Sequence, residues 1–355
     1  MKKTAARRGL AGQVAIVAGA TRGAGRGIAR GLGEAGAMVY CTGRSVSGQP
    51  SPYGRPETID ETADMIVASG GAATPVRVDH TVEAEVVALL ERVQREQGRL
   101  DVLVNSIGGE DPLMGFPAWL WDADLTNAEA VLRGSLLSHL ITLKHAARVM
   151  IGQGRGLIVE VTEGNSLGSG GGPVAQIVKL GLKGMALGLG AQLRPKGVAM
   201  VAITPGYLRS ESMLQGYGVT EANWRDGAKK DPNFLASETP LFIGRAVAAL
   251  AADPKVLRRA GQLFSSWELG RELGFTDADG SRPDWGRTKI DFSGHPPELL
   301  TWLRAGAEME TEWLATVAGR VRRFVKQLPA GPKRTAARKK TAQRPSRAAS
   351  PRRRT

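Results

Sequence analysis

The glycine-rich segment at 19–25, Gly-Ala-Thr-Arg-Gly-Ala-Gly, contains the residue types that point most directly to chemistry in this chain. It follows the apolar run 14–18 and precedes a helical pattern over 26–36, so the expected order is strand, turn and helix. Glycine adopts the positive φ of tight turns and lets backbone N–H groups come close to a phosphate. The helix N-terminus adds partial positive charge. The segment therefore predicts a dinucleotide site, and the alternative is an ordinary glycine-rich loop.

Strand-like and helix-like segments alternate along most of the chain. Strands buried on both faces are typically continuous apolar runs. We expect strands at Val14–Ala18, Ala37–Cys41, Thr74–Val78, Leu100–Asn105, Leu157–Thr162, Val198–Thr204 and Gln262–Ser265. Helical patterns occupy Arg26–Gly36, Val82–Gln97, Thr126–Met150, Val174–Arg194 and Thr239–Ala252. Repeated strand–helix units predict an α/β fold, a doubly wound parallel sheet of the Rossmann type, with ligands beyond the carboxyl ends of the strands.

Four segments are expected to lie outside this alternation. Residues 1–8 form a basic arm before a single domain over 9–292. The long mixed segment 207–238 is predicted to be a loop on the substrate side, and the alternative is a structural excursion. Apolar residues at helical spacing predict an appended amphipathic helix over 293–328, packed on the domain or on another subunit rather than on a membrane. Residues 329–355 have the composition of a disordered basic tail.

The net charge of +14 is concentrated at the two ends of the chain. Ten Lys and Arg residues and no acid follow position 330, whereas residues 9–330 are close to neutral. The tail could make weak contact with nucleic acid or an anionic surface through counterion release, or it could serve only as a solubilising end. Cys41 is the single cysteine, which excludes an intramolecular disulfide and favours a cytoplasmic location. No membrane span is expected, and a homo-oligomer is possible.

From Leu10 to about Trp285 the chain resembles the short-chain dehydrogenases/reductases. The resemblance is carried by AGATRGAG at 18–25, Asp79 after the third strand, LDVLVNSIGG at 100–109 and PGYLRS at 205–210. Within the family the chain is most similar to the dehydrogenase/reductase member 1 branch, through QGRLDVLVNS, the GLIV strand, SETPLFIGRAVAALAADP and ELGFTDADG. The resemblance implies a nicotinamide dinucleotide and hydride transfer to or from a carbonyl or alcohol carbon of a small molecule.

The residues expected near the adenosine ribose favour NADP(H) over NAD(H). An acid at the end of the second strand would bond the ribose hydroxyl of NAD, but here that strand leads into Thr42-Gly43-Arg44-Ser45. Arg44 and Arg22 can pair with a phosphate. The full set of expected cofactor contacts is Gly19, Thr21, Arg22, Gly23, Gly25, Arg44, Asp79, Asn105, Gly108, Lys179, Pro205 and Gly206.

The catalytic residues that the resemblance implies are only partly present. In the family a tyrosine transfers the proton, a lysine four residues later lowers its pKa, a serine polarises the substrate oxygen, and an asparagine supports a water relay. Lys179 matches the lysine and Thr162 offers a hydroxyl at the serine position. Ala175 stands where the tyrosine is expected, and Arg133 stands where the asparagine is expected.

Three interpretations of this incomplete set remain open. Glu163, His139 or Tyr207 could supply the proton, water could supply it in a slow reductase, or the chain could bind a dinucleotide without turnover as a sensor or scaffold. General acid–base catalysis contributes about 10²–10⁴-fold in rate, so the choice matters. Each candidate also has a structural alternative, which is a solvated acid for Glu163, an interior histidine for His139 and packing for Tyr207. His80 and His295 have no partners at metal-ligand spacing, so no metal site is expected.

Overall fold

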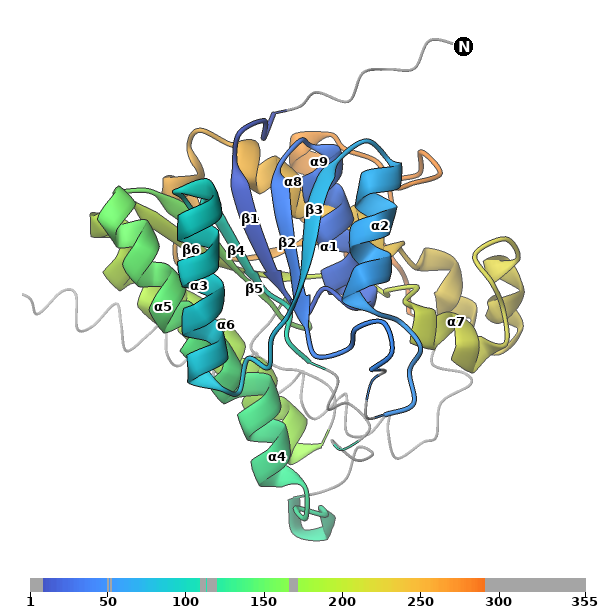
Figure 1. The fold of residues 1–355 in the computed structure, drawn as a ribbon. Coiled ribbons are helices and arrows are strands. Elements are labelled where there is room, and N and C mark those ends of the chain that lie inside the picture. Colours follow the sequence, from blue (N-terminus) through green and yellow to red (C-terminus); the bar gives the residue numbers. More distant parts are fainter. Residues whose placement is uncertain are drawn as a thin grey trace, which may run out of the picture. The chain divides into compact units, whose positions relative to one another are not determined.

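Seven parallel strands form one sheet in the order β3-β2-β1-β4-β5-β6-β7 (Figure 1). They are Val14–Ala18 (β1), Met38–Gly43 (β2), Ala72–Arg77 (β3), Val102–Asn105 (β4), Gly156–Val161 (β5), Val198–Thr204 (β6) and Leu263–Ser265 (β7). The strand order reverses between β1 and β4, and ligands of doubly wound sheets bind beyond the carboxyl ends of the strands at such a point. The computed structural model describes residues 9–49, 51, 53–108, 113, 120–165 and 172–290, which all belong to the compact unit Met1–Ala307.

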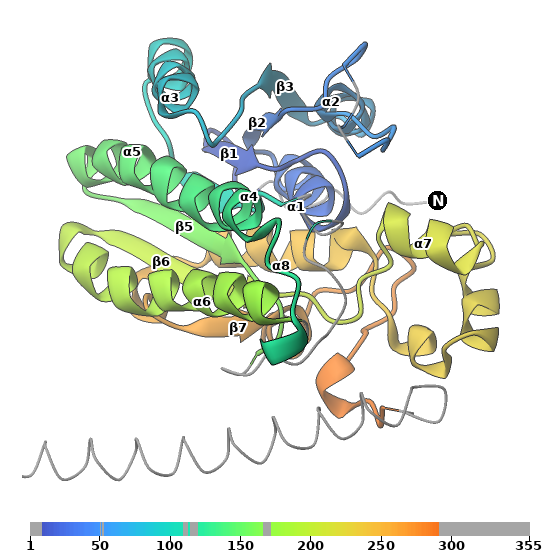
Figure 2. The ribbon, with the colours of Figure 1, turned by 90° about the horizontal axis from the view of Figure 1, so that it is seen from below.

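Helices cover both faces of this sheet (Figure 2). One face carries α1 (Gly23–Glu34), α2 (Ile59–Ala68), α8 (Pro240–Ala252) and α9 (Ser266–Leu273), and the other carries α3 (Glu83–Gln97), α5 (Ser138–Gln153) and α6 (Pro173–Leu193). Strand β1 shows why both faces are apolar. Ala15 and Val17 belong to the first core cluster and Val14 and Ile16 to the second, as the two-residue period of a strand requires.

The predicted α/β fold is confirmed, and all seven predicted strands are present, two of them with the predicted bounds and five shifted by one or two residues. Helices α2, α7 (Glu211–Tyr217) and α9 were not expected. Short helical turns complete the described chain at Leu120–Asp122 (η2), Arg194–Lys196 (η4), Trp224–Lys229 (η5), Pro232–Ala236 (η6), Val256–Arg259 (η7) and Trp285–Arg287 (η8). The predicted arm at 1–8, the appended helix at 293–328 and the tail at 329–355 lie outside the described residues, so these boundaries stay predictions.

The helix expected over 126–150 is interrupted. It consists of α4 (Ala128–Leu132), a π-helical turn at Arg133–Leu137 (η3) and then α5. A π-turn inserted into an α-helix frequently marks a functional site. Gly134 of this turn lines the pocket described below, so the irregular backbone faces the ligand side of the sheet.

One described helical segment, α6 continued by η4, is long and apolar enough to cross a membrane by length and composition alone. An 18-residue window within Pro173–Lys196 has a mean hydropathy of 1.2. The apolar character was not evident in the sequence because Lys179 and Lys183 interrupt the run. Ala186 and Leu193 pack in the second core cluster, so the inner side of α6 is covered by the sheet. The absence of a membrane span therefore stays a prediction.

Residues 207–238 form a loop with a small core of its own, which we call the flap. The ends of the flap are joined at Glu238, whose N–H donates to Tyr207 O and whose carbonyl accepts from Arg209 N–H, both at 2.8 Å. Phe234 is fully buried, and its ring centroid lies 4.5 Å from that of Tyr217 and 5.6 Å from that of Tyr207. α7 carries Tyr217 and η6 carries Phe234, whereas Tyr207 precedes α7. The flap is thus an ordered element.

The packing of α1 on α8 depends on glycine. A Cβ atom on Gly27 would lie 1.8 Å from the carbonyl oxygen of Pro240. A Cβ on Gly31 would lie 2.4 Å from the carbonyl carbon of Gly244. Both neighbours are backbone atoms, which cannot turn aside as a flexible side chain can. The two helices can therefore approach this closely only without side chains at these positions.

We expect Gly31→Ala to lower the free energy of unfolding by about 3 kcal/mol, because overpacking a close contact forces the backbone apart. Denaturant unfolding curves measure this change. Gly188→Ala is the matched control, because Gly188 lies in α6 with nothing within 4 Å of its added Cβ. That control should be neutral or stabilising by up to about 1 kcal/mol, since alanine is the better helix former. Equal effects of the two substitutions would contradict the close approach of α1 and α8.

Candidate active site

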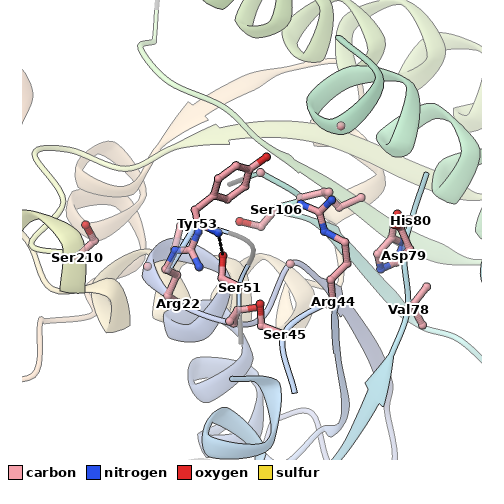
Figure 3. A pocket seen from close by; sticks show the side chains of 18 of the residues that line it. Arg22, Arg44, Ser45, Ser51, Tyr53, Val78, Asp79, His80, Ser106 and Ser210 are labelled. Atoms are coloured by element: carbon pink, nitrogen blue, oxygen red, sulfur yellow. Dashed lines mark hydrogen bonds between the residues drawn. The ribbon is translucent and has the colours of Figure 1, made fainter. Parts of the chain in front are cut away.

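A cavity of about 260 Å³ opens at the carboxyl ends of β1, β2, β3 and β4. Its walls are the ends of these strands and the residues that follow them, together with Gly134 and with Leu208, Ser210 and Ser212 from the beginning of the flap. The cavity lies where the strand order reverses, which is the position at which doubly wound sheets bind nucleotides. Figure 3 shows the side chains of Arg22 and Arg44 entering this cavity from the glycine-rich turn and from the end of β2.

The glycine-rich turn forms a cradle that only glycine permits. Gly19 has a φ of 85°, and a Cβ on it would lie 2.2 Å from the backbone oxygen of Ser106. A Cβ on Gly25 would lie 2.0 Å from the backbone oxygen of Gly19. Helix α1 begins at Gly23, and the residue before it, Arg22, makes no side-chain capping bond. The turn therefore presents the positive end of α1 to the cavity.

Asp79 and Arg44 give the outer end of the cavity its charge. The carboxylate of Asp79 accepts hydrogen bonds from the backbone N–H and the hydroxyl of Thr81, at 2.9 and 2.7 Å. Burial raises the pKa of Asp79, but the bonds from Thr81 and the nearby positive charge of Arg44 outweigh it, so its pKa lies below the ordinary value. Asp79 is therefore an ionised acceptor, and Arg44 stands at the end of β2 where an acid would favour NAD.

Asn105, expected to contact the cofactor, turns its side chain into the interior instead. It is fully buried, and its Nδ2 donates to Glu160 Oε1 at 2.7 Å and to the backbone oxygen of His139 at 3.3 Å. The residues after it, Ser106, Ile107 and Gly108, line the cavity. The Asn105 side chain points inward because Glu160, near the end of β5, offers its amide a buried acceptor.

His139 is also part of this buried network rather than a proton donor in the cavity. Its Nε2 donates to the backbone oxygen of Ile107 at 2.8 Å, and its Nδ1 lies 2.6 Å from Glu160 Oε2. Because Nε2 must carry a hydrogen to bond a carbonyl, one further proton is shared between Nδ1 and the Glu160 carboxylate. His139 is therefore an interior histidine, which is the structural alternative given for it above.

Lys179 and Glu163 form an ion pair at the end of β5. Lys179 Nζ lies 2.5 Å from Glu163 Oε2, and the two side chains are 17% and 65% exposed. Thr162, next to Glu163, directs its hydroxyl to the backbone oxygen of Lys179 at 3.3 Å. Ala175 lies one helical turn before Lys179 in α6 and is buried. The carboxylate of Glu163 is thus the acid that the structure brings to the predicted lysine.

Backbone contacts join this cluster to the predicted Pro205–Gly206 turn. The hydroxyl of Thr204 accepts from Gly164 N–H at 2.9 Å, which links the end of β5 to the end of β6. Gly206 N–H donates to the buried carboxyl of Glu238 at 3.0 Å. Neither Pro205 nor Gly206 lines the cavity. The turn is therefore tied to the end of β5 on one side and to the flap on the other.

Tyr207 directs its phenol into the flap. The hydroxyl lies 2.5 Å from that of Tyr217 and donates to Asp231 Oδ2 at 2.9 Å. Burial, followed by the bonds to Tyr217 and Asp231, raises the pKa of Tyr207 well above its ordinary value. Arg133 also differs from the expected asparagine, because its guanidinium reaches the backbone oxygen of Thr81 at 3.4 Å. Neither residue offers the proton-transfer group that the resemblance implies.

The cavity gathers most of the predicted adenosine and phosphate contacts and adds others. Predicted residues in its wall are Gly19, Thr21, Arg22, Gly23, Arg44, Asp79 and Gly108. Unpredicted polar residues in its wall are Ser45, Ser51, Tyr53, His80, Thr81, Ser106, Ser210 and Ser212. Ser210 could have been found, because it ends the PGYLRS motif, whereas Ser51 and Tyr53 lie in a loop with no periodic pattern. In the described part of the chain, no group of three His, Cys, Asp or Glu side chains could hold a metal ion.

Comparison with known proteins decides the family. Residues 13–217, more than half of the chain, match the family model for short chain dehydrogenase. This chain belongs to the short-chain dehydrogenases. The mouse protein named Dehydrogenase/reductase SDR family member 1 is 34% identical over 321 residues, covering 86% of this chain and 96% of the relative. The human protein of that name is 36% identical over 281 residues, covering 76% and 84%.

Solved structures show the same fold. A hydroxysteroid dehydrogenase from Escherichia coli superimposes with a TM-score of 0.57 at 22% identity, covering 74% of this chain and 98% of that structure. The predicted family and its member 1 branch are thus confirmed. This short-chain dehydrogenase is an oxidoreductase of a family that binds NAD(P), and family membership indicates a small-molecule substrate.

Proposed function

We propose that this short-chain dehydrogenase depends on NADP(H) and interconverts a carbonyl compound and an alcohol, with Glu163 carrying the proton in place of the absent tyrosine. When bound, NADP(H) supplies or accepts the hydride. The observation that carries the proposal is the 2.5 Å contact between Glu163 Oε2 and Lys179 Nζ. This contact places Lys179, the catalytic residue that matches the family, beside Glu163, an acid that can exchange protons.

The chain's residues fit a dinucleotide phosphate. A Cβ would fill the cradle at Gly19 and Gly25, and the positive end of α1 faces the cavity. Arg22 and Arg44 both line the cavity and supply cations. We assign Arg44 to the 2′-phosphate that distinguishes NADP from NAD, because a guanidinium pairs with phosphate through two parallel bonds. This assignment is the reason for preferring NADP(H).

The proposed proton transfer uses three side chains. Lys179 Nζ holds the Glu163 carboxylate at 2.5 Å, and in alcohol oxidation this carboxylate accepts the proton of the substrate hydroxyl. In carbonyl reduction the carboxylic acid returns that proton to the substrate oxygen. The Thr162 hydroxyl can turn from the Lys179 backbone oxygen to bond the same substrate oxygen, since its present contact is a long 3.3 Å. The exposure of Glu163 lets its proton exchange with water.

Dinucleotide binding without turnover is the second candidate function. It is favoured by the alanine at 175, since no phenol stands one turn before Lys179. Turnover separates the two functions. Aldehydes, ketones and secondary alcohols are incubated with NADP(H) while reduced nicotinamide is followed by absorbance, beside a fluorescence titration of NADPH. Oxidation or reduction of any substrate supports the oxidoreductase, whereas tight binding with no turnover supports the second function.

Arg44→Asp should weaken NADPH binding at least about tenfold, because a charged hydrogen bond is lost and repulsion is added. NADH affinity should change little. Titrations of both dinucleotides measure this, with Arg258→Asp as the control, because Arg258 is exposed in η7 and does not line the cavity. Unchanged NADPH affinity in Arg44→Asp would overturn the assignment of Arg44.

Three further parts of the proposal rest mainly on the sequence. The single cysteine favours a cytoplasmic location. The basic tail at 329–355, outside the described residues, is proposed to make weak contact with nucleic acid or anionic surfaces. Self-association is supported by exposed apolar side chains on α5 and α6, which include Leu140, Ile177 and Leu180 at 46%, 54% and 41% exposure.

A further inference from the structure

Glu211, the first residue of α7 in the flap, places its carboxylate on the glycine-rich turn. Gly23 N–H, at the start of α1, donates to Glu211 Oε2 at 2.7 Å. Arg26 Nη1 lies 3.2 Å from the other oxygen, Oε1. Both oxygens of one carboxylate are therefore engaged by the turn and by α1, although 188 positions of sequence separate Glu211 from Gly23.

The partners of Glu211 are fixed in place. Arg26 is buried, and its guanidinium also contacts Glu61 at 2.6 Å, the Thr62 hydroxyl at 3.1 Å and the Thr21 backbone oxygen at 3.0 Å. Arg22 provides no side-chain cap for α1, so Glu211 supplies the anion that the positive end of this helix favours. A carboxylate held in this way occupies a site that suits an anionic ligand.

Gly23 N–H belongs to the glycine-rich turn and to the positive end of α1, which the proposed function assigns to the phosphates of the dinucleotide. Ser210 and Ser212, on either side of Glu211, both line the cavity. A pyrophosphate and the Glu211 carboxylate would bring like charges together at the start of α1. Such repulsion disfavours simultaneous occupation, so the dinucleotide must displace Glu211 or bind less tightly beside it.

Displacing Glu211 would also loosen the part of the flap that contains α7. Glu211 begins α7, and Gln215 in the same helix accepts a hydrogen bond from Arg55, which precedes α2. These two contacts tie α7 to the cofactor half of the molecule, whereas Glu238 joins the ends of the flap to each other. Loss of the Glu211 contact would therefore loosen α7 without unfolding the rest of the flap.

We propose that Glu211 is an internal competitor of the cofactor pyrophosphate, so that dinucleotide binding releases α7 and couples cofactor occupancy to the flap. This inference rests on the proposed dinucleotide binding. The coupling is reciprocal, so a flap held by Glu211 lowers cofactor affinity by the same factor by which the cofactor weakens the Glu211 contact. The cofactor then binds first and leaves the flap free to adjust to the substrate.

Glu211→Gln tests the competition, because it keeps the size of the side chain and removes its charge. We expect this variant to bind NADPH about tenfold more tightly than the unaltered protein. Asp226→Asn is the matched control, since Asp226 is an exposed acid of the same flap that pairs with Lys229 at 2.9 Å. The control should bind NADPH within twofold of the unaltered protein.

Hydrogen exchange of the unaltered protein provides a second readout that needs no substitution. Adding NADPH should speed exchange of the amides of α7, whereas an ordinary ligand contact would slow it. In Glu211→Gln these amides should exchange rapidly before NADPH is added. Equal or weaker NADPH affinity of the variant, or slower α7 exchange on binding, overturns the competition while the proposed function stands. If neither protein binds NADPH or NADH, the proposed function fails and the competition fails with it.

Discussion

Glu163→Gln lowers the rate of hydride transfer about a hundredfold in our account and leaves NADPH affinity within twofold. The carboxylate is the group that Lys179 holds at 2.5 Å, and a glutamine amide cannot accept the substrate proton. General acid–base catalysis contributes about 10²–10⁴-fold, so its removal is expected to be large. Single-turnover absorbance of reduced nicotinamide measures the rate, and a separate titration measures NADPH affinity.

Two further variants provide the control for Glu163→Gln and the rescue of its activity. Asp226→Asn removes another carboxylate paired with a lysine, and it should leave turnover unchanged. Ala175→Tyr in the Glu163→Gln protein places a phenol one helical turn before Lys179, since residues four apart share a helix face. That double variant should regain activity. If Glu163→Gln retains full activity, the proton has another donor and the role of Glu163 is wrong.

Glu238→Gln should make the protein more stable at neutral and alkaline pH. Glu238 is buried, its Oε2 accepts from Gly206 N–H and from the Ser266 hydroxyl, and its Oε1 has no hydrogen-bond partner among the described residues. Burial raises the pKa of Glu238 to about 8, against the bonds from Ser266 and Gly206, which lower it. The folded protein therefore keeps a proton on this carboxyl that the unfolded chain loses at its ordinary pKa of 4.5.

The sign of the pH dependence follows from these two values. Below pH 4.5 both states are protonated and the contribution to stability is complete. As the pH rises from 4.5 to about 8, ionisation of Glu238 should lower the free energy of unfolding by about 1.4 kcal/mol per pH unit. Above about 8 both states are ionised and the loss stops. Glutamine mimics the neutral acid and abolishes the loss.

Denaturant unfolding of both proteins from pH 5 to pH 9 measures the effect, and the advantage of Glu238→Gln should grow up to about pH 8. Glu272→Gln provides a control of opposite sign. The hydrogen bond from Arg259 lowers the pKa of Glu272, so its ionised form stabilises the fold and the substitution should destabilise at pH 7. An advantage of Glu238→Gln that does not change with pH would show that Glu238 is ionised in the folded protein.

The strands could be predicted because burial on both faces leaves a direct mark on the sequence. β1 and β6 are buried at every position and coincide with their predicted ranges. Helices α2 and α7 were missed because they are short and follow loops rich in glycine, proline and serine. The pairing order of the strands depends on contacts far apart in sequence, so it required the structure.

Site residues could be predicted where a short motif sets the local backbone geometry. They could not be predicted where a side chain binds a partner that is distant in the sequence. The glycine turn needs only its own backbone and the strand beside it, and Gly19 and Gly23 line the cavity. Their contact with a cofactor stays a prediction. The inward direction of the Asn105 side chain could not be read from the sequence, because its partner Glu160 lies 55 positions away. The contact of Glu211 with Gly23 gives no sequence signal, since either residue alone has an ordinary local role.

Hydride transfer with NADP(H), carried out by the chain itself, is the activity we propose. Its most direct test uses NADPH deuterated at the transferring carbon, incubated with the carbonyl panel, followed by mass spectrometry of the product alcohol. We predict that one deuterium appears on the carbinol carbon with the unaltered protein, and that far less appears with Glu163→Gln in the same time. Tight NADPH binding without deuterium in any product would contradict the claim and leave dinucleotide binding as the function.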